Sequence, residues 1–600
     1  MNLKGAIRFE RNQALFYSLV VGTAMFIYVT GGAIINPTNR DWLMFGDAAT
    51  HYFGWEFFRN TPLFQWPIGA NYPLGMELSS SIVFTDSIPV AAYVAKLFNP
   101  ILPATFQYLG IWIWLCFVLQ AFFAQRFLKF FVSNRTSVYL GACFVVLSPP
   151  LVYRLIHAGS GHIALASHWL ILASFCLYLQ PGRNDAKWSV LFALCWLVHA
   201  YFSPMIAAVW LASLVRRSYF DNERLSVVKS FMIIMTTSLF IMWASGYFII
   251  GSNFNPAGWN YVFRWEPLSL VDSGTATSTG WSRILPNRTQ TDGTTEAFSF
   301  LGVSVMVMMT TSMTGMISVK MLRHRRLCAF TVFVAVMFVY LVVNLLSTDR
   351  ALSFLSLFMI VAFGFTVVHR IFLDRQRMKT FSPLVIVTAS LALYSMTNRI
   401  GLGQQTLFEF PLFPPLKQFT ETFRTHGRFI WPIYYLAVFS AIIFFVRTTS
   451  RKYLPYAIIA LLLFQIYDSS NASNLTRQRF TKSPQWSSPL KDSRWGMFAE
   501  RYDHVVFVPP LNNDPDEIWI AIDELASKYQ LSTNSGYFSR YDPSKFVSMT
   551  EKYITQINSD QMDDQTIYVL DPKFFPKVYH IPEDMENSIK IMDGFFVITP

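Results

Sequence analysis

Charged residues are scarce in this sequence. Only 14% of its 600 residues are Asp, Glu, Lys or Arg, while 53% are hydrophobic; a soluble domain usually carries about 25% charge. Apolar runs of about 20 residues recur along the chain, and each is long enough to cross a hydrocarbon core of about 30 Å. The composition therefore excludes an ordinary soluble protein and predicts an α-helical membrane protein with many spans.

Cysteine is also rare, and its placement excludes two kinds of site. The five cysteines lie in or beside apolar runs, at Cys116, Cys143, Cys176, Cys195 and Cys328. They form neither a disulfide framework nor a metal-binding spacing. The short basic segments between apolar runs also lack a Gly-rich phosphate loop, so no nucleotide site is expected there.

The net charge of +12 could indicate a nucleic-acid partner in a soluble protein. Here the Lys and Arg residues cluster in short segments between apolar runs, so we interpret them as topology signals and expect no nucleic acid. About thirteen transmembrane helices are predicted, at residues 14–35, 104–125, 137–156, 162–180, 188–201, 203–215, 229–250, 298–319, 327–346, 351–369, 381–398, 429–446 and 453–467.

The stretch 188–215 could form one long tilted span or two short spans broken at Ser203-Pro204, and we count it as two. With two spans there, the basic clusters all fall on one side, which the positive-inside rule assigns to the cytoplasm together with the N-terminus. The run 14–35 is too long for a signal-peptide core and is interpreted as an uncleaved first span. Loop 36–103 and the tail then face the opposite, extracytoplasmic side.

Two domains are predicted: a transmembrane domain over 1–467 and a small extracytoplasmic α/β domain over 468–600. The tail contains apolar segments typical of buried strands, an amphipathic helical segment and two closing strands, at 504–510, 566–572, 517–529 and 589–600. Strands that alternate with helices favour an α/β fold.

The first outer loop, 36–103, is expected to contain helices that lie in the membrane interface. In "GDAATHYFGWEFF", Asp47, His51 and Trp55 recur at helical spacing and share one face. The apolar stretch before Lys96 is too short to span and fits an interfacial helix. Acids and aromatic rings at this boundary suit a sugar on a lipid carrier; the alternative is an aromatic belt with a helix-capping Asp.

Basic side chains recur in the outer segments. Arg154, His157 and His162 stand between two spans, where they could bind phosphate or orient a sugar, or simply form local hydrogen bonds at the interface. Arginines on the outer side run against the inside bias, and a lipid phosphate or pyrophosphate would explain them, as would ordinary anionic lipid. They are Arg264, Arg283 and Arg288 in loop 251–297, and Arg424 and Arg428, which flank His426, in "FRTHGRFIWP".

Six phrases in order, "FGDAATHYFGWEFFR", "SSSIVFTDSIP", "HAGSGHIALASHW", "VHAYFSPM", "TEAFSFLG" and "FRTHGRFIWPIYY", resemble a largely uncharacterised bacterial membrane family within the glycosyltransferase C superfamily. The superfamily's first-loop acid maps onto Asp47, with Asp41 as second choice. A second acidic motif is missing, and His157 and His162 stand in its place. No acid accompanies these histidines in the sequence, so no cofactor is expected, and a divalent metal is kept only as the less favoured alternative.

The resemblance implies an inverting transfer of a sugar from a polyprenyl-phosphate donor to a cell-envelope polysaccharide, lipopolysaccharide or glycolipid, at the outer side of the bacterial inner membrane. Asp47 would be the catalytic base. The residues expected to bind substrate are Asp41, His51, Tyr52, Trp55, His157, His162, Arg288, Arg424, His426 and Arg428. A transporter or flippase of a lipid-linked sugar and a non-enzymatic envelope-assembly protein are the alternatives.

Overall fold

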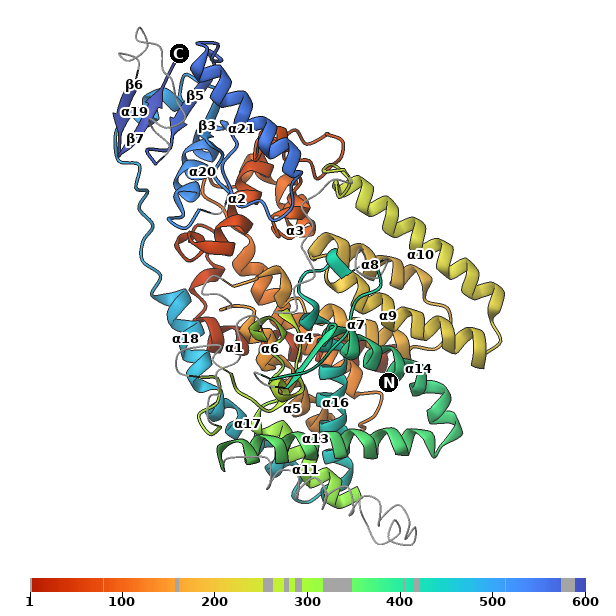
Figure 1. Ribbon diagram of the computed structural model, residues 1–600. Coiled ribbons are helices and arrows are strands. Elements are labelled where there is room, and N and C mark those ends of the chain that lie inside the picture. The colour runs from red at the N-terminus through yellow and green to blue at the C-terminus, as the bar shows by residue number, and fades with distance from the viewer. Residues whose placement is uncertain are drawn as a thin grey trace.

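The computed structural model of the protein is mostly helical, with a small sheet near the C-terminus (Figure 1). It describes residues 3–78, 80–156, 161–251, 263–274, 280–285, 294–316, 348–402, 405–414, 420–512, 514–573 and 589–600. The long helices of the body are α1 Leu3–Thr30, α4 Leu109–Leu128, α5 Arg135–Val146, α7 Trp169–Leu179, α8 Asp185–Val198, α9 Phe202–Val215, α10 Arg224–Ser245, α11 Val303–Met316, α13 Thr348–Phe372, α14 Arg375–Ser395, α16 Trp431–Thr448 and α17 Leu454–Asp468.

Six helical segments of the described residues are long and apolar enough to cross a membrane: Asn12–Thr30, Leu109–Leu128, Arg135–Tyr153, Arg224–Ser245, Arg375–Ser395 and His426–Thr448. Four shorter apolar segments accompany them: Ala164–Leu179, Val303–Met313, Ser356–Phe372 and Leu454–Asp468. The predicted run 327–346 lies outside the described residues. The structure thus establishes a largely helical body with six candidate spans, and the count of thirteen stays a prediction.

The doubtful stretch 188–215 forms two helices rather than one. Helix α8 ends at Val198, and α9 begins at Phe202. The break falls a few residues before the predicted Ser203-Pro204, because Pro at an early helix position suits the start of a helix and not its interior. His199 occupies the break in an extended conformation, and its side chain is buried.

Two helices of the first loop were expected and are present. Helix α2 spans Gly46–Asn60 and α3 spans Pro89–Leu97. The two pack against each other, and α2 also contacts α20 of the C-terminal region. Helix α2 is amphipathic in sequence, yet most of its aromatic side chains are buried between these neighbours.

The C-terminal region contains a five-stranded sheet in the order β4-β3-β5-β7-β6. Its elements are α19 Arg494–Ala499, β3 His504–Val508, α20 Ile518–Tyr529, β4 Ser532–Thr533, α21 Pro543–Asn558, β5 Thr566–Leu570, β6 Ile589–Met592 and β7 Phe595–Ile598. Strand β3 is parallel to β4 and β5, whereas β7 is antiparallel to β5 and β6. The predicted tail strands and helix coincide with β3, β5, β6, β7 and α20.

The C-terminal region sits directly on the first loop, at one end of the molecule (Figure 1). Thr533 of β4 donates its N–H to the carbonyl of Pro73 and accepts from the N–H of Gly75, each at 2.8 Å. Leu74 thereby forms a parallel bridge with Thr533 and extends the sheet. The Lys552 ammonium lies 2.6 Å from the Glu77 carboxylate, so two elements of the C-terminal region hold the same segment.

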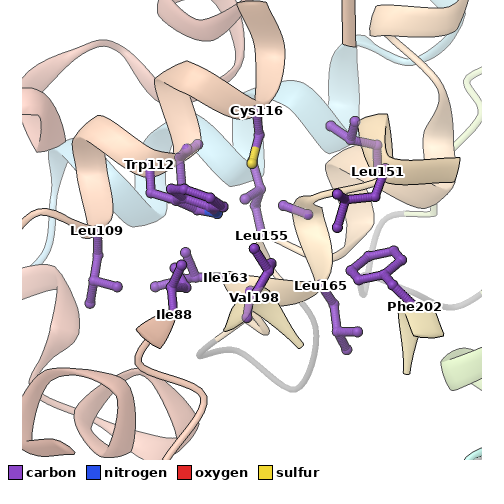
Figure 2. Close-up of a cluster of buried hydrophobic side chains, with 14 of the residues drawn as sticks. Ile88, Leu109, Trp112, Cys116, Leu151, Leu155, Ile163, Leu165, Val198 and Phe202 are labelled. Atoms are coloured by element: carbon purple, nitrogen blue, oxygen red, sulfur yellow. The ribbon is translucent and has the colours of Figure 1, made fainter. Parts of the chain in front are cut away.

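A buried apolar cluster joins the first loop to the helical body. Figure 2 shows side chains from the start of α3, from α4, from residues 151–155 and 163–165, and from the ends of α8 and α9 packed together. The labelled residues are Ile88, Leu109, Trp112, Cys116, Leu151, Leu155, Ile163, Leu165, Val198 and Phe202. All of them are at least 92% buried. Three residues of this cluster, Ile88, Ile163 and Val198, stand within two positions of Asp86, His162 and His199 in the chain.

Candidate active site

Asp47 lies in the first turn of α2, at the seam between the first loop and the C-terminal region. The N–H of Gly46, which opens the helix, donates to Glu517 Oε1 at 2.8 Å, so a side chain of the C-terminal region satisfies a helix-start donor. The Asp47 side chain is only 22% exposed. It is therefore a partly buried carboxylate at an anchored helix end, where negative charge is favoured.

His162 links Asp47 to a second acid. Its Nε2 lies 3.3 Å from Asp47 Oδ2 and 3.7 Å from Glu296 Oε1. The preceding Gly161 has φ +80°, and a Cβ there would lie 2.6 Å from the carbonyl oxygen of Leu155. Only glycine fits both conditions, and this tight turn places the His162 ring between the two carboxylates.

Two buried arginines hold Glu296. Arg154 donates from Nη1 to Glu296 Oε2 at 2.7 Å and from Nη2 to its backbone carbonyl at 3.1 Å. Arg428 donates to the same Oε2 from Nη2 at 2.9 Å and from Nε at 3.1 Å. The Arg154 and Arg428 side chains are 0% and 6% exposed. Such charges are tolerated in the interior only because they are paired with good geometry.

Asp86 and His199 form a second acid–base pair beside the first. His199 Nε2 lies 3.3 Å from Asp86 Oδ1, and its Nδ1 accepts from the N–H of Tyr201 at 3.2 Å. Because Nδ1 accepts, the proton of the neutral ring sits on Nε2 and points at Asp86. Asp86 has φ +52°, a conformation that is costly for a residue with a side chain and that clusters at functional sites.

His51, Asp86 and His162 offer donor atoms of the type that binds a divalent cation. One ligand atom from each lies within 4.8 Å of the others, and imidazole nitrogens with carboxylate oxygens suit several divalent metals. His51 is 1% exposed, and its Nδ1 has no hydrogen-bond partner within the described part of the chain. The type and spacing of the donors fit a metal, although each carboxylate already has a basic neighbour.

The surroundings move the pKa values of these groups apart. Burial, with the negative charges of Asp86 and Glu296, raises the pKa of Asp47 to about 6, against the opposing charges of Arg428 and Arg424. Burial disfavours the charged form of Asp86, but His199, His51 and His162 together outweigh burial and hold the pKa of Asp86 below its ordinary value. Burial lowers the pKa of His51 to about 4. At neutral pH, Asp47 is thus an ionised but unusually basic carboxylate beside a neutral His51.

Four of the residues predicted from the sequence meet in this cluster. His51, His162 and Arg428 lie around Asp47 as described above. Arg424 is exposed at the rim; its charge acts on Asp47, and its side chain hydrogen-bonds to Tyr537 of the C-terminal region. We name the acid and base side chains of Asp47, Asp86, His51, His162, His199, Glu296, Arg154 and Arg428 the polar cluster.

Other predicted residues lie elsewhere. Asp41 accepts from the N–H of Trp486 at 3.1 Å and so anchors the segment that leads into the C-terminal region. His426 is fully buried, with Nε2 3.1 Å from the carbonyl of Thr420. His157 and Arg288 lie outside the described residues.

The helical face shared by Asp47, His51 and Trp55 does not point to one site along its length. Trp55 is 1% exposed and donates from Nε1 to the carbonyl of Phe106 at 3.0 Å. It lies about 12 Å beyond Asp47 along the helix axis, inside packed structure. Tyr52 is directed instead toward Arg40 and Glu56.

Three members of the polar cluster, Asp86, His199 and Glu296, were not among the predicted site residues, and Arg154 was predicted only as a basic residue that could bind phosphate or orient a sugar. Their signals were present, because Asp86, His199 and Glu296 stand within the phrases "SSSIVFTDSIP", "VHAYFSPM" and "TEAFSFLG". A single sequence does not show which distant segments lie close together in the fold, so these side chains could not be placed beside Asp47.

Comparisons with known proteins place the chain in a family. No curated protein matches it. One solved structure that is similar is the archaeal oligosaccharyltransferase AglB from Archaeoglobus fulgidus in complex with an inhibitory peptide and a dolichol-phosphate, with 10% sequence identity, a TM-score of 0.36, and coverage of 94% of this chain and 70% of that one. The model described as "Domain of unknown function (DUF6311)" matches residues 19–354 and 349–470, and that of the DUF6311 C-terminal domain matches residues 494–600. The chain belongs to the DUF6311 family.

Proposed function

We propose that this protein is a membrane glycosyltransferase that transfers a sugar from a polyprenyl-phosphate donor to a glycan or glycolipid acceptor of the cell envelope. The observation that carries the proposal is the polar cluster around Asp47, at the end of a helical body with six candidate spans. A partly buried carboxylate whose pKa is about 6 is suited to act as a general base near neutral pH.

In the proposed reaction, Asp47 accepts the proton of an acceptor hydroxyl. The hydroxyl oxygen forms a bond to the anomeric carbon from the face opposite the lipid phosphate, and the bond from that carbon to the phosphate oxygen breaks. The electron pair leaves with the phosphate, so the configuration at the anomeric carbon inverts. Because His162 contacts both Asp47 and Glu296, it positions the base and can share its proton.

The departing phosphate needs positive charge. Arg424 is exposed at the rim and is the cation best placed to meet a lipid phosphate. Arg428 is committed to Glu296 by two hydrogen bonds, and it supports the site through its buried charge. Arginines bind phosphate oxygens in bidentate fashion, and preorganised cations stabilise charge that develops during transfer.

A divalent cation would be held by His51, Asp86 and His162, where it would offset phosphate charge. The proposed transfer needs no such ion, because the base and the cations are supplied by side chains. We further propose that the N-terminus is cytoplasmic in the bacterial inner membrane, and that the polar cluster and the C-terminal region face the other side, as the distribution of Lys and Arg indicates.

The test replaces the base without changing its shape. Cells that lack the protein are complemented with wild type, with Asp47→Asn, or with Asp374→Asn as a matched control, and the envelope glycan is analysed by mass spectrometry. Asp374 caps α14, where Asn is an equivalent cap. We expect the sugar to be absent only with Asp47→Asn; its presence at the wild-type level with a stably inserted Asp47→Asn protein overturns the assignment.

A further inference from the structure

A second site lies on the opposite side of α2 from the polar cluster. A cavity of about 790 Å³ opens at the seam between the first loop and the C-terminal region. Its walls come from α2, from the segment after α3, from the linker before α19, and from α20. The volume falls within the range of about 300–1,000 Å³ that is usual for small-molecule sites.

Side chains fix the shape of this cavity across the seam. Arg40 of the first loop forms an ion pair with Glu524 of α20, and the indole N–H of Trp486 donates to the other oxygen of Glu524 at 2.7 Å. Arg40 also bonds to the Tyr52 hydroxyl, which bonds to Glu56. The wall is therefore a connected network rather than a set of mobile surface groups, and it is organised before any ligand arrives.

Basic and acidic side chains line the cavity in equal number. Arg40, Arg59 and Lys528 stand beside Glu56, Glu524 and Asp492, and Asp492 is bound by Arg494 outside the lining. Arg59 is held by Asn99 Oδ1 at 2.8 Å, by the carbonyl of Ala104 at 2.8 Å and by Glu56 at 3.4 Å. Since Arg40 and Arg59 are already paired with Glu524 and Glu56, neither offers a spare charge to a phosphate or nucleotide, and the remaining cation of the lining is Lys528.

The remaining lining is a mixture of rings and hydrogen-bonding groups. Trp486 and Tyr529 are partly exposed and present ring surface, and Ser488, Ser527 and Gln530 add small polar side chains. A lipid chain would not be matched by so many polar atoms. The lining would match an uncharged ligand that has many hydroxyl groups and apolar ring faces. The hydroxyl groups would bond to the polar side chains, and the ring faces would pack against Trp486 and Tyr529.

We propose that this cavity binds an oligosaccharide segment of the cell-envelope glycan. Identifying that segment with the acceptor chain rests on the proposed function. Glu56 lies about 13 Å beyond Asp47 along α2, so the helix sets the distance between the bound segment and the base. The C-terminal region thus supplies one wall of a glycan-binding site.

Binding can be tested without turnover. The purified full-length Asp47→Asn protein is titrated with size-fractionated oligosaccharides, released by mild acid from the envelope polysaccharide of the source cells, and followed by calorimetry and tryptophan fluorescence. We expect saturable binding and a fluorescence change from Trp486. Ser527→Trp fills the cavity from α20, and Ser559→Trp places the same ring at the exposed end of α21 as the matched control.

The proposal predicts at least a tenfold loss of affinity for Ser527→Trp and wild-type affinity for Ser559→Trp. Absence of binding at millimolar oligosaccharide, or equal binding by the two variants, overturns it. Glu524→Gln provides a second test of the same cavity in case Ser527→Trp does not fold. It keeps the shape of the side chain and is also expected to weaken binding. Because no sugar is transferred in this measurement, its outcome is independent of whether Asp47 proves to be the catalytic base.

Discussion

His162 Nε2 lies 3.3 Å from Asp47 Oδ2, although the two residues come from different parts of the chain. This contact joins the first loop to the segment between α6 Pro149–Tyr153 and α7, and it sets the orientation of the proposed base. Glu296, at 3.7 Å from the same Nε2, extends the contact to the two buried arginines.

Replacement of His162 by Ala is expected to reduce sugar transfer by about 10- to 100-fold, because Asp47 loses the group that positions it and shares its proton. The measurement is the initial rate of transfer in membranes. His369→Ala, near the end of α13, controls for loss of a histidine as such. Equal rates for wild type and His162→Ala would show that the contact has no part in catalysis.

Replacement of Glu296 by Gln is expected to lower the free energy of unfolding by about 3–5 kcal/mol, because two buried arginines then lose their shared counter-charge. Thermal unfolding of the detergent-solubilised protein measures the effect. The exposed pair Arg399–Glu409, at 3.5 Å, supplies the control, since Glu409→Gln should cost less than about 1 kcal/mol. Similar losses for both variants would contradict the role of Glu296.

The pH dependence follows from the raised pKa of Asp47, which is about 6. A general base must be ionised, so the rate of transfer should fall as the pH falls through about 6, whereas an unperturbed Asp would keep the rate constant down to about pH 4. Initial rates of the wild type between about pH 4 and 8 test this. A flat profile across that range is incompatible with Asp47 as the base.

Transfer is predicted to persist after treatment with EDTA. The reason is that each carboxylate of the polar cluster already has a basic neighbour: His162 for Asp47, His199 for Asp86, and the arginines for Glu296. The rate is measured before and after chelation. A tenfold loss that Mn²⁺ restores in the wild type but not in Asp86→Asn would instead place a cation at His51, Asp86 and His162.

Substitution of Gly427 tests how closely the segment that contains Arg428 approaches the segment that contains Glu296. A Cβ there would lie 2.3 Å from the Cβ of Ala297 and 2.8 Å from the carbonyl of Phe263, so Gly427→Ala must push Arg428 and Glu296 apart. We expect losses of both thermal stability and transfer. At Gly364 a Cβ meets nothing within 4 Å, so Gly364→Ala should affect neither. Unchanged stability of Gly427→Ala would contradict the packing described here.

The periodicity of the chain was sufficient to predict much of the fold. Helix α2, the paired helices α8 and α9, and strands β3 and β5 appear where apolar spacing and charge clusters indicated. These elements depend on local pattern, which a single sequence records. The number of spans is not settled in the same way, because several apolar helices are shorter than a full crossing.

The site was less accessible to prediction because its contacts are long-range. Helical spacing placed Asp47, His51 and Trp55 on one face of a helix. It does not reveal that Trp55 is buried away from the site, that His162 contacts Asp47, or that Asp86 lies near His51. In the same way, His426 was predicted to bind substrate because Arg424 and Arg428 flank it in the sequence. Its ring instead points into the protein, toward the carbonyl of Thr420. Spacing predicts which residues share a face, and the tertiary fold decides what that face meets.

Asp47 is proposed to catalyse sugar transfer from a lipid phosphate. The most direct measurement incubates the purified protein in nanodiscs with polyprenyl-phosphate sugars and an envelope-glycan acceptor, and quantifies the free polyprenyl phosphate by mass spectrometry. The account predicts its release by wild type and Asp374→Asn, and release slowed about 100-fold or more by Asp47→Asn. Release by Asp47→Asn at the wild-type rate, or intact donor in every sample, would contradict the account.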